Sequence, residues 1–118
     1  MYIYNRYIYN CYMEPPLTPA VFFTLFALAN GEKHGYAIMQ ETGQLSGGKF
    51  RMGPGTLYTT IQRLWSLGLI AEVPGDSDTD PRRRYYRLTN EGRTLLQLEV
   101  DRMRDLVTLA EGRTTCES

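Results

Sequence analysis

The sequence has few of the residues from which metal and redox sites are built. It contains one histidine and two cysteines, and Cys11 and Cys116 lie near opposite ends of the 118 residues. No His, Cys, Asp or Glu cluster has metal-ligand spacing, so we expect no metal, no cofactor, and free thiols in a reducing, cytoplasmic compartment. The chain also lacks an apolar run of about twenty residues, the length that a membrane-spanning helix requires.

The residue patterns of common enzyme sites are also missing. No nucleophile is paired with a base in a defined motif, and Gly53-Pro54-Gly55 is too short for a phosphate loop and lacks its lysine. We therefore expect that the protein is not an enzyme.

A strong net charge is a further absence. Thirteen basic residues balance thirteen acidic ones, which excludes a polycation held to nucleic acid by bulk charge. The distribution is uneven, because residues 49–63 contain three basic side chains and no acid, and residues 82–93 contain five arginines and one glutamate. A neutral chain of this kind can still present one basic face.

The stretch from Gly53 to Ile70 has the pattern of a short two-faced helix. We expect Thr56 to cap its start and Gly68 to end it in a left-handed conformation. Helical spacing predicts one buried side, formed by Leu57, Ile61, Leu64 and Trp65.

The opposite side of this helix carries hydroxyls and a guanidinium but no acid. It consists of Thr56, Thr59, Thr60 and Arg63, with Tyr58 at its edge. Such a surface suits the major groove of DNA, where Arg63 can bind guanine and the threonines can contact phosphates or thymine methyl groups. The alternatives are a solvated surface and, for Tyr58, packing against the preceding helix.

The surrounding elements predict a winged helix-turn-helix, a mainly α fold with a small β-hairpin. Helices are expected at about 19–29, capped by Thr18, and from about residue 33, with Tyr36 among the packing residues of the second. Strands are expected at 69–73 and 84–88, joined by a turn-forming loop. In the second strand Tyr86 and Leu88 should face inward, leaving Arg83 and Arg87 free.

A final helix is expected from about Asn90 to Glu111, capped by Thr89. Its heptad seam, together with two phenylalanines on the surplus apolar face of the first helix, predicts a homodimer. The alternative is a helix folded back on its own domain. The expected dimer residues are Phe23, Phe26, Leu96, Val100, Met103, Val107 and Ala110.

Four motifs in order resemble the PadR family of bacterial transcriptional regulators: residues 34–36, 55–58, 63–70 and 83–93. The resemblance runs from about Leu17 to Gly112, and the single C-terminal helix is similar to the short subfamily. Thr59 stands where the family often has proline. The resemblance implies a homodimeric repressor of a palindromic operator, released in several members by an aromatic or lipophilic effector.

These observations predict three segments: residues 1–16 as an N-terminal arm or a misassigned extension ahead of Met13, 17–89 as the DNA-binding domain, and 90–118 as the dimerisation helix and tail. Trp65 is expected in the core or, alternatively, stacked on an effector. A winged-helix module that binds only proteins remains the alternative function. The expected contacts to double-stranded DNA are Lys49, Arg51, Thr56, Tyr58, Thr59, Thr60, Arg63, Arg82, Arg83, Arg84 and Arg87.

Overall fold

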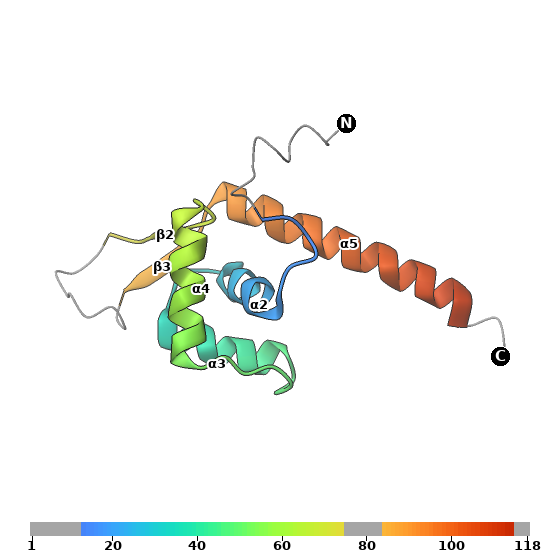
Figure 1. Ribbon diagram of the computed structural model, residues 1–118, viewed down its shortest axis with the longest axis horizontal. Coiled ribbons are helices and arrows are strands. Elements are labelled where there is room, and N and C mark those ends of the chain that lie inside the picture. Colours follow the sequence, from blue (N-terminus) through green and yellow to red (C-terminus); the bar gives the residue numbers. More distant parts are fainter. Residues whose placement is uncertain (1–12, 75–83, 115–118) are drawn as a thin grey trace.

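The computed structural model describes residues 13–74 and 84–114, which form helices around a small sheet (Figure 1). The longest helix, α5, extends well beyond the other elements and gives the molecule an elongated shape of 59 × 38 × 22 Å. In chain order the elements are α2 (Pro19–Leu28), β1 (Lys33–His34), α3 (Gly35–Leu45), α4 (Pro54–Ser66), β2 (Ile70–Glu72), β3 (Tyr85–Leu88) and α5 (Asn90–Thr114).

The ends of the helices follow local signals in the sequence. Thr18 Oγ1 accepts the Val21 N–H at 3.3 Å at the start of α2, and Thr89 Oγ1 accepts the Gly92 N–H at 3.0 Å at the start of α5. Gly68 adopts φ +77° after α4, which confirms the left-handed stop. These three boundaries match the expectations from sequence.

The start of α4 differs from the expected one. Gly53 is the N-cap residue and Thr56 lies inside the helix, so the prediction of Thr56 as the cap was wrong. The reason is Pro54, which has no N–H to satisfy and a fixed φ that suits the first helical position. The helix therefore begins at the proline.

The sheet contains the expected hairpin and one strand that was not expected. β2 and β3 pair antiparallel, with Ile70 opposite Leu88. β1 pairs with the other edge of β3, giving the order β1-β3-β2. The sequence predicts residues 33 and 34 at the start of a helix, because two residues are too few to show a strand pattern.

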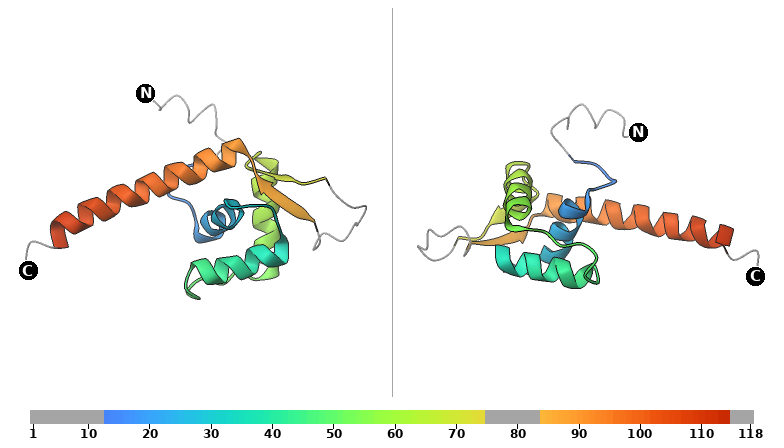
Figure 2. Two further views of the ribbon diagram at one scale, coloured as in Figure 1. Left: turned by 180° about the vertical axis from the view of Figure 1, so that it is seen from behind. Right: turned by 60° about the horizontal axis from the view of Figure 1, so that its bottom comes forward.

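The hydrophobic core surrounds α2, which packs against α3, α4 and α5 (Figure 2). Leu25, Leu57 and Leu64 are fully buried there. Two aromatic residues expected to pack inward are exposed instead: Trp65 (50% exposed) and Tyr36 (57% exposed). Consecutive helical residues diverge by about 100°, so Trp65 points away from the core that Leu64 fills.

The first part of α5 belongs to this core, and the rest does not. Leu95 and Leu96 are buried, and Gly92 lies so close to Leu69 that a side chain there would collide with the Leu69 carbonyl oxygen. Beyond Met103 the helical side chains are exposed, and Figure 2 shows this part running away from the other helices. Only the first part of α5 is therefore folded back on its own domain.

A buried carboxylate joins α5 to the segment before α2. Glu99 is 1% exposed and accepts hydrogen bonds from the Leu17 N–H at 3.0 Å and Arg102 Nε at 2.6 Å. The Arg102 hydrogen bond and, to a smaller extent, the Leu17 amide hold the pKa of Glu99 below its usual range, although burial acts in the opposite direction. Met13 is also buried, whereas residues 1–12 of the expected arm lie outside the described residues.

Candidate nucleic-acid interface

The exposed side of α4 has the composition expected for a groove-binding surface, except that it contains Gln62 and not Thr60. Thr56, Thr59 and Arg63 are exposed, whereas Thr60 is buried at 8% and lies on the core side of the helix. Gln62 is exposed on the outward, polar side of the helix, the side on which Thr60 was also expected. The spacing of residues in the sequence could not predict whether Thr60 is buried or exposed, because Thr60 lies on the boundary between the buried and exposed faces of the helix.

The first turn of α4 presents backbone rather than side chains. Gly53, Pro54 and Gly55 are exposed, no side chain caps the helix, and no heavy atom lies within 4 Å of the position of a Cβ on either glycine. Helix N-termini carry partial positive charge and free N–H groups, which favour phosphate. A duplex can therefore approach this turn closely.

Tyr58 occupies the edge of the α4 surface. Its side chain is half-buried, and its hydroxyl lies against Gly35 at the start of α3, where an added Cβ would collide with it. This contact corresponds to the alternative of packing against the preceding helix. It holds α4 against the first turn of α3.

The basic side chains of the described residues divide into two groups. Six of them are partnered: Lys33 with Asn30, Arg84 with Glu72, Arg93 with the Ala29 carbonyl, Arg102 with Glu99, Arg104 with Asp101, and Arg113, which also interacts with another group. Four others form no hydrogen bond or ion pair with any described residue: Lys49, Arg51, Arg63 and Arg87. All four are exposed and belong to the expected DNA contacts.

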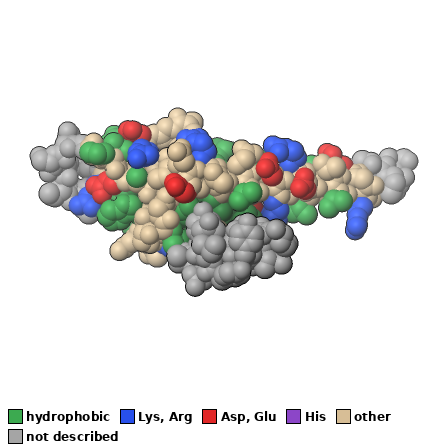
Figure 3. Space-filling view, turned by 90° about the horizontal axis from the view of Figure 1, so that it is seen from above, with side chains coloured by type: hydrophobic (Ala, Val, Ile, Leu, Met, Phe, Trp, Pro, Cys, Tyr) green, Lys and Arg blue, Asp and Glu red, His purple; other side chains and the backbone are tan. Residues whose placement is uncertain are grey.

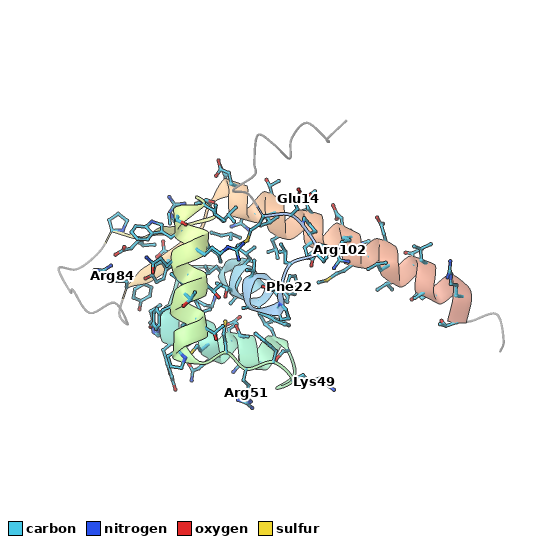
Figure 4. All side chains as sticks on the ribbon, in the orientation of Figure 1. Glu14, Phe22, Lys49, Arg51, Arg84 and Arg102 are labelled. Atoms are coloured by element: carbon cyan, nitrogen blue, oxygen red, sulfur yellow. The ribbon has the colours of Figure 1, made fainter. Side chains whose placement is uncertain are left out.

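The turn between α3 and α4 determines where two of these cations lie. Gly47 and Gly48 adopt φ +64° and +80°, conformations that favour glycine. Ser46 Oγ accepts the Phe50 N–H at 3.0 Å and so closes the turn. Lys49 and Arg51 follow this turn on the same side as the start of α4 (Figure 4).

The hairpin strand β3 has the predicted alternation. Tyr86 and Leu88 are buried, and Arg87 is exposed. Arg84 forms an ion pair with Glu72 at 3.5 Å, so its charge is partly neutralised (Figure 4). Burial raises the pKa of the Tyr86 hydroxyl; Glu72 adds to this increase and Arg84 opposes it. Arg82, Arg83 and the aspartates of the loop lie outside the described residues.

The outer face of the sheet also carries aromatic groups that are not among the expected DNA contacts. His34 pairs with Tyr85 across β1 and β3, and their rings lie 5.3 Å apart, edge to face. His34 Nδ1 accepts the Ala37 N–H at 3.2 Å and thus caps α3. This histidine connects the helix-turn-helix to the hairpin, and the described residues hold no metal-binding cluster around it.

The expected dimer residues are divided between the core and the surface. Leu96 is buried, Val100 and Met103 are half-buried, and Val107 is 55% exposed. Phe26 is exposed, whereas Phe23 is half-buried and stacks on Phe50 with a centroid distance of 5.7 Å. Hydrophobic side chains alternate with charged ones along the arm of α5, the part beyond Met103 (Figure 3). Further exposed apolar residues of α5 are Leu98, Leu106 and Leu109.

Residues 24–98 match the family described as "Transcriptional regulator PadR-like family". The transcriptional regulator Rv3488 of Mycobacterium tuberculosis is 44% identical over 69 residues, which cover 58% of this chain and 60% of that protein. The matches span between 23% and 60% of the length of the curated relatives.

Solved structures of PadR proteins have the same fold as this chain. A PadR family transcription regulator from Clostridium difficile R20291 superposes with a TM-score of 0.64 at 24% identity, covering 81% of this chain and 97% of that one. Bacillus subtilis PadR in complex with operator DNA superposes with a TM-score of 0.56 at 23% identity, covering 65% and 44%. The mainly helical winged-helix fold expected from sequence is thereby confirmed. No helix among the described residues is long and apolar enough to cross a membrane.

Proposed function

Because this chain belongs to the PadR-like family of transcriptional regulators, we propose that it binds a palindromic operator as a homodimer and represses transcription until a small aromatic or lipophilic effector releases it. Membership of a regulator family agrees with the expectation that the chain is not an enzyme. A protein that acts on bacterial operators works in the cytoplasm.

One observation carries the proposal for DNA. The four cations without a partner among the described residues, Lys49, Arg51, Arg63 and Arg87, lie on the α3–α4 turn, on α4 and on β3, the elements that a winged helix presents to a duplex. Cations paired within the protein have little charge left for phosphates, whereas these four retain theirs.

The alternative, a winged-helix module that binds only proteins, is less well supported. An apolar exposed surface on α4 would be the signature of such a module, and apart from Pro54 and Trp65 the exposed side of α4 is polar or glycine.

The proposal of a homodimer rests on the residues of the heptad seam that the core does not cover. Val107 and Ala110 are exposed on the part of α5 that extends beyond the core, where a second copy of the helix can cover them. Phe26 adds an exposed apolar side chain from α2.

The effector rests mainly on the family resemblance. Trp65 offers a position for it, because its ring is half exposed at the end of α4 and open to stacking. It is also the only tryptophan of the chain, so its emission reports directly on a ligand bound there.

A single titration series tests the proposal. Purified full-length protein is added to labelled duplexes from its own promoter region and to a scrambled duplex of equal length, at several salt concentrations. We expect tighter binding to one promoter fragment, protection of two half-sites with centres about 10 base pairs or a multiple apart, and loss of affinity as salt rises. Equal affinity for all duplexes would contradict sequence-specific regulation.

The effector is tested on the same complex. Aromatic carboxylic acids and lipophilic cations are added while DNA anisotropy and Trp65 emission are followed together. We expect at least one compound to lower the anisotropy and shift the emission at the same concentration. Release of DNA with unchanged emission would place the effector elsewhere.

A further inference from the structure

The outward side of α4 carries one amide, Gln62, among hydroxyls and a guanidinium. Its side chain is exposed and forms no hydrogen bond with any described residue. Ser66, one turn later, is not available to it as a donor, because Ser66 Oγ already donates to the Arg63 carbonyl at 2.9 Å. The amide therefore keeps both its donor and its acceptor for an external partner.

The neighbours of Gln62 give no intramolecular reason for an amide at this position. The residues three and four positions away along the helix are Tyr58, Thr59, Trp65 and Ser66, and none of them is charged. Pairs that stabilise an exposed helix use these spacings and usually include a charge. A solvated glutamine without such a partner adds little to the stability of α4.

We propose that Gln62 determines sequence specificity by reading an adenine in the major groove, an inference that rests on the proposed function. The side-chain amide presents a donor and an acceptor in one plane, and adenine presents the complementary pair at N7 and N6. Thymine, guanine and cytosine do not offer this pair on one base edge.

The position of Gln62 on α4 separates this contact from that of Arg63. Adjacent helical residues diverge by about 100°, so the two side chains point to opposite edges of the exposed face, with Thr59 between them one turn earlier. Gln62 lies on the edge shared with Tyr58, which is held against the start of α3. Each half-site should therefore contain an adenine read by Gln62 and a separate guanine read by Arg63.

The inference is tested by selecting bound sequences from randomised double-stranded DNA with the full-length chain and with Gln62→Ala and Gln62→Glu. Gln97→Ala is the matched control, because Gln97 is an exposed glutamine on α5 that bonds to Asp101. We expect the wild-type protein and the control to select one adenine per half-site that Gln62→Ala no longer selects. At that position the discrimination should fall by about 5- to 150-fold, the range of one bidentate contact.

The Gln62→Glu variant supplies a second readout. A carboxylate accepts from cytosine N4, so the selected base should change from adenine to cytosine at the same position while the other positions stay the same. Identical selected sequences for all variants, or affinity lowered equally on every sequence, would overturn the role of Gln62 and leave the proposed function intact. If the wild-type protein itself selects no sequence, the proposed function fails, and this inference fails with it.

Discussion

The carboxylate of Glu99 accepts the backbone N–H of Leu17 at 3.0 Å, a contact between residues 82 positions apart in the sequence. Arg102 bonds to the same carboxylate from one turn further along α5. This arrangement anchors the long helix to the segment that leads into α2. It also places an ionised group at the base of the arm that we propose as the dimer surface.

Replacing Glu99 by alanine should destabilise the fold. The change leaves a partly buried N–H at Leu17 without its acceptor, so we expect a loss of roughly 1–3 kcal/mol in the free energy of unfolding. Glu99→Gln should lose less, because its amide oxygen can still accept from Leu17. Urea denaturation of both variants measures the difference, and equal losses would show that the Leu17 hydrogen bond is not the important contact.

Glu99 should also make stability depend on pH in the acid range. Its pKa is lowered in the folded state, so its stabilising effect is fully present above the pKa of an unfolded glutamate, about 4.3, and is lost as the pH falls through the lower folded value. We expect the stability of the wild-type protein to fall more steeply than that of Glu99→Gln as the pH falls below about 4.3. If stability falls equally with pH in both proteins, groups other than Glu99 cause the acid sensitivity.

Two glycines of α5 should respond in opposite ways to the same substitution. Gly92→Ala puts a Cβ against the Leu69 carbonyl oxygen, which is backbone and cannot move easily, so we expect a loss of about 1–3 kcal/mol. Gly112→Ala meets no atom within 4 Å and should be neutral or stabilising by less than about 1 kcal/mol. Thermal unfolding followed by circular dichroism tests both, and a tolerated Gly92→Ala would mean that α5 can shift away from Leu69.

Removal of one unpartnered cation should change the salt dependence of DNA binding. Arg87→Ala should reduce the slope of log affinity against log salt by about one phosphate contact, with little change in sequence preference. Arg104→Ala is the control, because Arg104 pairs with Asp101 on α5, away from the proposed interface. An unchanged slope for Arg87→Ala would show that the β3 strand does not face the phosphates.

The dimer surface can be tested at neighbouring positions of α5. Val107→Glu puts a charge into the exposed seam and should convert the dimer to monomer, whereas Thr108→Glu places the same charge about 100° around the helix, off the seam. Sedimentation velocity measures the oligomeric state. Both variants should keep the wild-type melting of the domain core, because both residues are exposed. If both variants are monomeric, or if neither is, the heptad seam of α5 is not the dimer interface.

Local sequence determined the elements of this protein because caps, turns and periodicity act over a few residues. Thr18, Thr89 and Gly68 set helix ends through hydrogen bonds and backbone conformation within one turn. The alternation in β3 placed Arg87 outward and Tyr86 inward for the same reason, since neighbouring strand residues point to opposite faces.

Tertiary packing decided which side chains at the boundaries of a face are covered. Thr60 and Trp65 lie at opposite edges of the buried arc of α4, and helical spacing cannot tell how wide that arc is, because its width depends on the neighbouring elements. The burial of Glu99 and the pairing of β1 with β3 also required partners distant in sequence. The sequence by itself thus determined the order and type of the elements except β1, while only the packed fold decided which residues of α4 are exposed.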